Sequence, residues 1–280
     1  MTTTQNTTPT QTQPSALEDL KTKQQKIWSS GDYGKIAWIT VPIARELAEA
    51  VELRPGARVL DVATGTGHVA LEAARTLCEV TGIDYVPELI DVARRRAEAE
   101  GLEVDFEVAD AEALPFLDDT FDFVVSAIGV MFTADHDRAA AELVRTCRPG
   151  GRIGLASWTP TGFVGQMLKA VGRHVPPPPA AQSPTRWGDG DVVEELLGDR
   201  VHDVASYTAT VTQRFASPES YADFFLTHYG PTYAAASRLD DAGRAALRDD
   251  LVRIAHQANR SVDRTFVSDW DYLVVTAEKR

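Results

Sequence analysis

The most informative residues of the chain read Val59-Leu60-Asp61-Val62-Ala63-Thr64-Gly65-Thr66-Gly67-His68. A short apolar strand here ends in a glycine-rich turn, and the turn opens a helix. Glycine lets the backbone approach a ligand where a Cβ would collide, and the first turn of a helix offers unpaired N–H groups and a partial positive charge. By itself the pattern also fits a glycine turn that only packs a strand against a helix, or the dinucleotide-binding turn that accepts alanine in its last place.

Strands and helices alternate beyond this turn. The sequence predicts strands at residues 58–62, 79–84, 104–108, 121–127 and 152–157, with helices at 68–76, 87–99 and 137–147 between them. This alternation is typical of βαβ units and a parallel sheet. Later in the chain we expect helices near 163–172 and 192–197, a strand near 206–214, helices over 218–259 and a closing strand at 272–277.

Acidic residues follow the next two predicted strands. Asp84 lies at the carboxyl edge of the second strand, where a carboxylate can accept hydrogen bonds from both hydroxyls of a ribose. Asp110 follows the third strand and can accept from an adenine amino group, with the Ala111 backbone facing the ring. Because the carboxyl ends of neighbouring parallel strands form the ligand-binding edge of such sheets, these positions predict one shared site.

With these pieces the chain resembles the class I S-adenosylmethionine-dependent methyltransferases, and most of all the quinone-biosynthesis C-methyltransferase type and its small-molecule relatives. The matching stretches cover residues 60–67, 82–84, 110–115, 121–125 and 148–151. The resemblance implies a Rossmann-like α/β fold: a seven-stranded, mostly parallel sheet with an antiparallel last strand, helices on both faces and a small helical cap. It also implies S-adenosyl-L-methionine as cofactor and S-adenosyl-L-homocysteine as product.

The resemblance further implies roles for individual residues. The glycine turn would meet the methionine part of the cofactor, with Asp61 orienting it, while Asp84 would bind the ribose and Asp110 the adenine. Ala63 replaces the first glycine of the family's loop, and Ala127 stands where the quinone enzymes carry a small polar residue. Similar enzymes close an N-terminal lid over the cofactor. The predicted cofactor-binding residues are Tyr33, Asp61, Ala63, Thr64, Gly65, Thr66, Gly67, Asp84, Tyr85, Asp110, Ala111 and Ala127.

We divide the chain into a disordered tail at 1–15, a lid helix and loop at 16–41, a cofactor-binding core at 42–160, and the last two strands at 161–280 with a cap inserted at about 217–262. The cap and the loops after the fourth and fifth strands would form the acceptor pocket. Our candidates for its lining are apolar or aromatic, which suits a small, partly hydrophobic acceptor: Met131, Phe132, Trp158, Trp187, Tyr229 and Tyr233. Two histidines, His228 and His136, are the candidate general bases.

Composition limits the partners. The net charge of −13 makes a phosphate backbone an unfavourable substrate, and no apolar run reaches the roughly 18 residues of a membrane span. No histidine and carboxylate cluster has metal-ligand spacing. We therefore expect a metal-independent, cytoplasmic enzyme that acts on a small-molecule acceptor, and a homodimer is compatible with the sequence. Two alternatives remain open: a protein that binds S-adenosylmethionine without transferring its methyl group, and an NAD-dependent oxidoreductase.

Overall fold

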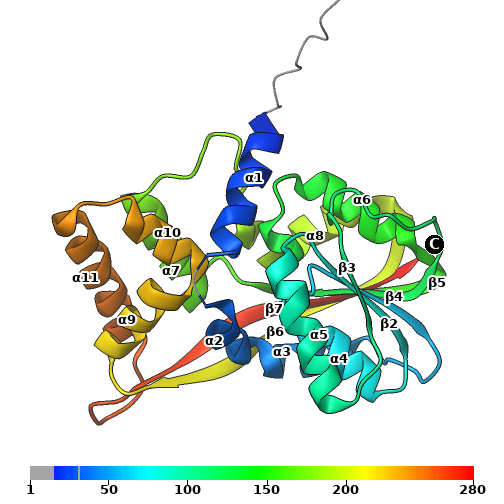
Figure 1. Ribbon diagram of the computed structural model, residues 1–280, viewed down its shortest axis with the longest axis horizontal. Helices are drawn as coiled ribbons and strands as arrows, with labels where there is room; N and C mark the ends of the chain where they lie inside the picture. The colour runs from blue at the N-terminus through cyan, green and yellow to red at the C-terminus, as the bar shows by residue number, and fades with distance from the viewer. Residues whose placement is uncertain (1–15, 31) are drawn as a thin grey trace, which may run out of the picture.

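The computed structural model of the protein describes residues 16–30 and 32–280, so the predicted tail at 1–15 lies outside the described residues. In this part of the chain, seven strands form one sheet in the order β3-β2-β1-β4-β5-β7-β6 (Figure 1). The strands are β1 (Arg58–Val62), β2 (Glu79–Asp84), β3 (Asp105–Val108), β4 (Phe121–Ala127), β5 (Cys147–Trp158), β6 (Val201–Phe215) and β7 (Phe266–Lys279).

The strand pairing matches the predicted α/β sheet. β1 pairs in parallel with β2 and β4, β2 with β3, and β4 with β5, whereas β7 runs antiparallel to both β5 and β6. Parallel neighbours need crossover connections, and helices supply them. The expected mostly parallel sheet with an antiparallel last strand is therefore confirmed.

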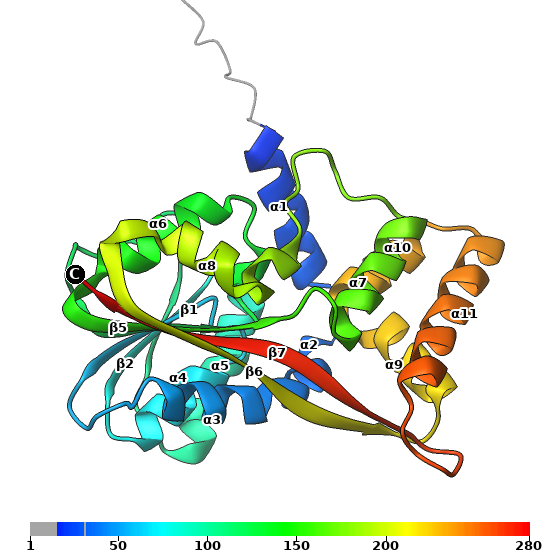
Figure 2. The ribbon, with the colours of Figure 1, turned by 180° about the vertical axis from the view of Figure 1, so that it is seen from behind.

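Helices cover both faces of the sheet, as Figures 1 and 2 show from opposite sides. One face carries α3 (Val41–Ala50), α4 (His68–Arg75) and α5 (Pro87–Glu100), and the other carries α6 (His136–Thr146) and α8 (Gly190–Leu197). The central strands are buried on both sides, because Val59, Leu60 and Val124 have no exposed surface. Continuous apolar strands of this kind need such a double cover.

A helical lobe stands beside the sheet, and it is larger than the predicted insert. It contains α9 (Pro218–His228), α10 (Gly230–Ser237) and α11 (Asp241–Ala258), together with α7 (Phe163–His174), which precedes β6 in the chain (Figure 1). α7 is tied to α11 by a contact of 2.9 Å between His174 Nε2 and Asp250 Oδ2. The cap is thus assembled from two separate segments of the sequence.

The last two strands are longer than predicted, and the extra length carries the lobe. β6 and β7 stay paired from Val201 to Phe215, beyond the edge of the parallel strands. Along β7 inward and outward residues alternate, with Phe266 and Trp270 buried and Asp269 exposed. The sequence predicted shorter strands because charged residues interrupt the apolar runs. Such interruptions are expected in strands that are half-buried rather than apolar throughout.

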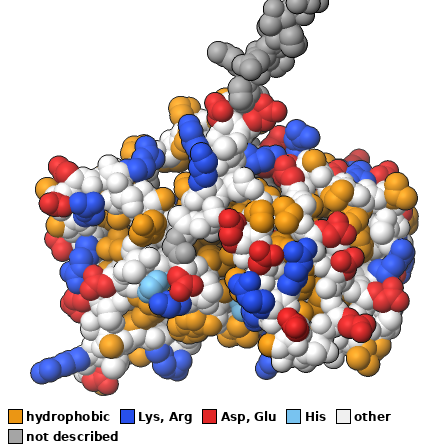
Figure 3. All heavy atoms as spheres, in the orientation of Figure 1, with side chains coloured by type: hydrophobic (Ala, Val, Ile, Leu, Met, Phe, Trp, Pro, Cys, Tyr) orange, Lys and Arg blue, Asp and Glu red, His pale blue; other side chains and the backbone are white. Residues whose placement is uncertain are grey.

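The predicted lid segment contains α1 (Ala16–Trp28) and α2 (Tyr33–Ala37), followed by the 3₁₀ turn η1 (Trp38–Thr40). Two other 3₁₀ turns lie further along the chain, η2 (Val130–Phe132) after β4 and η3 (Pro184–Gly188) after α7. α1 lies between the sheet and the helical lobe in both views (Figures 1 and 2). Among the described helices, none combines the length and the apolarity needed to cross a bilayer. Figure 3 shows acidic and basic side chains interspersed over the face drawn there.

β5 begins at Cys147 rather than at the predicted residue 152, and α6 ends one residue earlier than expected. The pairing of β4 with β5 shifts register between Phe121 and Phe123, so the Pro149-Gly150-Gly151 segment forms an irregularity within the strand instead of a separate loop. Gly150 has φ 68°, a left-handed value that favours glycine.

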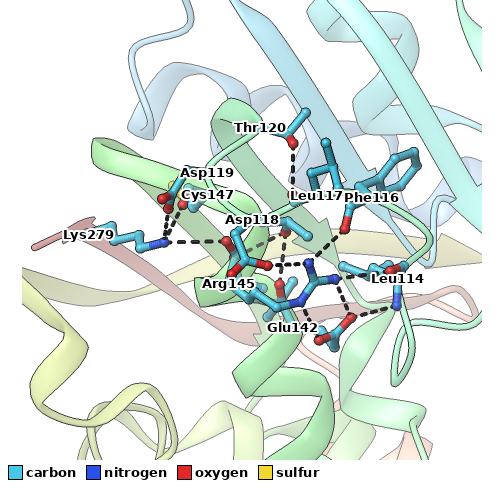
Figure 4. Close-up of polar contacts among 12 residues, drawn as sticks. Leu114, Phe116, Leu117, Asp118, Asp119, Thr120, Glu142, Arg145, Cys147 and Lys279 are labelled. Atoms are coloured by element: carbon cyan, nitrogen blue, oxygen red, sulfur yellow. Dashed lines mark hydrogen bonds and ion pairs between the residues drawn. The ribbon is translucent and has the colours of Figure 1, made fainter.

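Arg145, in the last turn of α6, fixes the loop that leads from β3 to β4 (Figure 4). Its guanidinium donates to the carbonyl oxygens of Leu114 and Phe116 and pairs with Glu142, whose carboxylate also accepts the Leu114 N–H at 2.7 Å. Nearby, Lys279 donates to the Cys147 carbonyl at 2.7 Å. This network anchors the far end of the loop that starts at the binding edge of the sheet.

Gly188 offers a test of the packing between η3 and β5. A Cβ at this position would lie 2.0 Å from the carbonyl oxygen of Trp158, whereas a Cβ at Gly172 of α7 meets only Pro177, at 4.0 Å. We predict that Gly188→Ala lowers the free energy of unfolding by about 1–3 kcal/mol. Gly172→Ala is the matched control and should be neutral or stabilising by up to about 1 kcal/mol. Urea denaturation measures both, and equal stability of the two variants would contradict the close contact.

Candidate functional site

The strand ends that carry the predicted motifs meet at one cavity. Gly65 after β1, Asp84 at the end of β2, and Asp110 after β3 all line it. We call this space of about 620 Å³ the central cavity. Its remaining walls come from α1, from α2 and from the turn after β4. The lining comprises Lys21, Gln24, Trp28, Tyr33, Ala63, Gly65, Ile83, Asp84, Tyr85, Leu89, Ala109, Asp110, Ala111, Glu112, Ile128, Gly129, Phe132, Thr133 and Ala134.

The glycine turn has the backbone that the sequence pattern requires. Gly65 and Gly67 have φ values of 55° and 87°, and Gly67 precedes the first residue of α4. A Cβ on Gly67 would approach Phe106 to 3.0 Å. Ala63 also has a positive φ, of 54°, a conformation that costs an alanine about 1–2 kcal/mol. Ala63 therefore occupies a backbone position that suits glycine.

Asp61 stabilises this turn through hydrogen bonds of its side chain. Its side chain is buried and accepts hydrogen bonds from Thr64 Oγ1 at 2.5 Å and from the Ala70 N–H at 2.9 Å. Burial raises the pKa of the Asp61 carboxyl to about 7, although these two hydrogen bonds oppose the shift. Asp61 lines a second space of about 370 Å³ beside the turn, which we call the loop cavity, together with Thr64, Thr66, His68 and Ala127.

Asp84 ties the turn to the neighbouring strand. One carboxylate oxygen accepts the Gly65 N–H at 2.9 Å, and the other accepts the Val86 N–H at 2.9 Å. Burial raises the pKa of the Asp84 carboxyl to about 6. Asp84 lines the central cavity, and a carboxylate can accept more hydrogen bonds than the two described here, so the group can hold the turn and also accept bonds from a ligand.

Asp110 and its neighbours are joined to the lid by a lysine that the sequence did not single out. Lys21 Nζ lies 2.6 Å from Asp110 Oδ2 and 2.8 Å from Glu112 Oε2. Although partial burial lowers the pKa of Lys21, its bonds to Asp110 and Glu112 raise it overall. The lysine sits in a polar helix that carries few apolar residues, so no local signal marked its long-range contact.

A third space, which we call the aromatic chamber, adjoins the central cavity, with which it shares Trp28, Tyr33, Ile128 and Phe132. Four predicted pocket or lid residues line it: Tyr33, Phe132, Trp158 and Tyr229. The others are Trp28, Ile36, Ile39, Thr40, Ile128, Val164, Met167, Phe225 and Trp270. Trp28 was missed because the sequence from this residue to Gly34 reads as a loop, whereas in the structure it is the last residue of α1 and its ring packs against Phe132 with centroids 4.8 Å apart.

Three predicted pocket residues lie elsewhere. Met131 and Trp187 have no exposed surface and line none of the three spaces. Tyr233 lies in an outer groove of the helical lobe with Arg244 and Arg248. The aromatic pattern alone did not distinguish chamber residues from core residues, because both need large apolar side chains.

Neither predicted base reaches the site. His136 is fully buried against Trp187, with ring centroids 5.7 Å apart, and burial lowers its pKa to about 4. The His228 ring packs edge to face against Phe224, with centroids 5.0 Å apart, and lines none of the three spaces. The two histidines are therefore not retained as candidate bases. His68 does line the loop cavity, but burial lowers its pKa to about 3, so its ring is neutral.

Tyr33 and Ile128 are shared by all three spaces. Ile128 has φ 55°, which is rare for a β-branched residue and costs about 1–3 kcal/mol. Its N–H donates to the Ala156 carbonyl at 2.8 Å, and this bond to β5 helps to hold the strained turn. Such strain is commonly found at functional sites.

Within the described part of the chain, no cluster of three or more His, Cys, Asp or Glu side chains could hold a metal ion.

Comparisons with known proteins agree with this geometry. The profile of a methyltransferase domain family matches residues 59–151. An uncharacterized protein of Mycobacterium tuberculosis is 41% identical over 95% of this chain and 98% of its own length. Demethylmenaquinone methyltransferase of Thermus thermophilus is 48% identical over 37% of this chain and 48% of its own. The crystal structure of the YcgJ protein of Bacillus subtilis shares the fold, with a TM-score of 0.58 and 20% identity over 85% of this chain and 98% of its own.

The matched stretch spans the glycine turn, Asp84, Asp110 and the strand that carries Ile128 at its end. The fold, the convergent strand ends and these relatives agree with one another. The chain belongs to the class I S-adenosylmethionine-dependent methyltransferase family.

Proposed function

We propose that the enzyme transfers a methyl group from S-adenosylmethionine to a small, uncharged and largely hydrophobic acceptor bound in the aromatic chamber. The observation that carries this proposal is that the three spaces share two lining residues. Tyr33 and Ile128 border the central cavity, the loop cavity and the chamber at once. A donor in the first two spaces and an acceptor in the third would therefore meet beside these two residues.

The residues present fit the cofactor. We assign the turn at Gly65 and Asp61 to the methionine part, Asp84 to the ribose hydroxyls, and Asp110 with the Ala111 backbone to the adenine. The supporting fact is that Asp84 and Asp110 line one cavity with Gly65 and Tyr33. Tyr85 and Ala127 border the same spaces and complete the proposed site.

When bound, the cofactor supplies an electrophilic methyl group on a sulfonium. The chain's contribution is then to align an acceptor atom with that carbon and to exclude water. The rings of Trp28, Phe132 and Tyr229 lie edge to face and close one side of the chamber. A buried aromatic wall of this kind positions a flat molecule and keeps the space dry.

The acceptor's charge follows from the chamber's lining. No carboxylate, imidazole or amine lines it, and its polar atoms belong to Thr40, to tyrosine hydroxyls and to tryptophan N–H groups. Burying an unpaired charge there would cost several kcal/mol. A neutral aromatic or quinol-like molecule avoids this cost. One relative is named a demethylmenaquinone methyltransferase, which is compatible with such an acceptor.

The acceptor class can be tested with labelled methyl transfer from S-adenosylmethionine to pairs of neutral and charged analogues of the same ring system. We expect transfer to the neutral members. Trp158 lines only the chamber, whereas Tyr233 lies outside it. Trp158→Phe should raise KM for the acceptor several-fold and leave S-adenosylhomocysteine affinity unchanged, and Tyr233→Phe should change neither.

Transfer confined to charged acceptors would contradict the proposed acceptor class. Tight cofactor binding without transfer to any acceptor would instead favour a binding protein with another role. Binding of NAD in place of S-adenosylhomocysteine would favour an oxidoreductase.

The buried carboxyls predict how cofactor affinity depends on pH. The pKa of Asp61 is raised to about 7 and that of Asp84 to about 6 in the ligand-free protein. The positively charged cofactor favours their ionised forms, so its affinity should fall as pH decreases from about 7.5 to 5. The free energy of unfolding of the ligand-free protein should instead rise as pH decreases over the same range. A raised carboxyl pKa means that the folded chain binds protons more readily than the unfolded chain.

Calorimetry with S-adenosylmethionine and thermal unfolding across this pH range measure the two trends. Asp61→Asn should flatten the upper part of the affinity profile and Asp84→Asn the lower part. An affinity that stays constant between pH 5 and 7.5 would show that these carboxyls do not face the cofactor.

A further inference from the structure

α1 contacts the site through side chains on one helical face. Lys21, Gln25 and Trp28 follow one another at intervals of four and three residues, which places them on the same side of a helix. Leu20 is the one buried residue assigned to this helix. The helix is therefore held over the cavity mainly by polar and aromatic contacts rather than by an apolar face.

Each of the three side chains reaches a different part of the site. Lys21 bridges Asp110 and Glu112, at 2.6 and 2.8 Å, and Gln25 Nε2 donates to the Tyr85 carbonyl at 2.5 Å. Trp28 lies in both the central cavity and the aromatic chamber. The same helix thus touches the loops after β2 and β3 and supplies a wall of the acceptor space.

Glu112 extends this connection to the turn after β4. It is 4% exposed, and its Oε1 accepts the N–H groups of Ala134 and Asp135 at 2.7 and 3.0 Å. Its other oxygen meets Lys21. Without the ammonium, Glu112 would be a buried carboxylate close to a second one at Asp110, which is an unfavourable arrangement.

We propose that Lys21 is a positioning residue that latches α1 over the bound cofactor and couples cofactor binding to completion of the acceptor chamber. In the latched state Lys21 lines the central cavity beside Asp110, and Trp28 packs against Phe132 and Tyr229 at centroid distances of 4.8 and 5.9 Å. The cofactor would enter before the latch closes, and the product would leave only after the two ion pairs break. This proposal rests on the assignment of the central cavity to the cofactor.

The latch predicts a specific kinetic change. Lys21→Met keeps the length of the side chain and removes its charge, and loss of one partner of a partly buried ion pair acts mainly on dissociation. We expect S-adenosylhomocysteine to dissociate about tenfold faster, with KM for the acceptor raised and the rate of a single bound turnover less affected. Lys21→Arg should restore most of the difference, because guanidinium can bridge two carboxylates.

Lys23 provides the matched control. It is exposed on the same helix and has no ion pair within the described part of the chain, so Lys23→Met should leave the dissociation rate unchanged. Hydrogen exchange provides a second measurement, in which the cofactor product should protect residues 16–28 in the wild type and in Lys23→Met, but much less in Lys21→Met.

The outcomes separate the two hypotheses. Suppose that the wild type binds S-adenosylhomocysteine and that Lys21→Met matches Lys23→Met in dissociation rate and in exchange protection. The proposed role of Lys21 is then wrong, and the assignment of the central cavity to the cofactor is unaffected. If the wild type does not bind S-adenosylhomocysteine at all, the proposed cofactor site fails and the latch fails with it. Glu112→Gln gives an independent check, because its effect should not add to that of Lys21→Met.

Discussion

Parallel pairing of β1, β2 and β3 is the constraint on which the site depends. In this register Val62 lies opposite Ile83 and Asp84 opposite Val108, so the three following loops start side by side at one sheet edge. The glycine turn can then receive a hydrogen bond partner from the next strand, Asp84, and both can border a cavity with Asp110. A single ligand that spans these loops needs no further movement of the core.

The site retains features that oppose stability. Ile128 and Ala63 adopt positive φ values, and Asp61 and Asp84 are two buried carboxyls that repel each other when ionised. The surrounding sheet is buried on both faces and can hold these unfavourable elements in place. In the proposed function, this strained turn and these carboxyls would form a site that is organised before the ligand arrives.

Sequence reasoning located the parts of the site that depend on local pattern. Strand ends, the glycine turn, Asp84 and Asp110 follow from periodicity and spacing, and they line the expected edge of the sheet. It missed Lys21 and Trp28, because their partners Asp110, Phe132 and Tyr229 lie far along the chain and a polar helix carries no sign of them. Met131, Trp187 and the two histidines were assigned to the acceptor site, but they line none of the three spaces, because a buried core and a buried pocket use similar residue types. The length of β6 and β7 depended on their pairing with each other, which neither strand shows alone.

The aromatic chamber is built from segments far apart in the chain: α1 and α2, the turns after β4 and β5, and the helical lobe carried by β6 and β7. Tyr33 and Ile128 line the chamber and both other spaces. Trp28 and Phe132 are shared with the central cavity, and Thr40 is shared with the loop cavity. A crystal structure with S-adenosylhomocysteine tests this arrangement most directly. The account predicts continuous ligand density from Asp110 past Asp84 to the glycine turn, with the sulfur facing the chamber beside Tyr33 and Ile128. Density that leaves the central cavity empty, or that turns the sulfur away from the chamber, would contradict it.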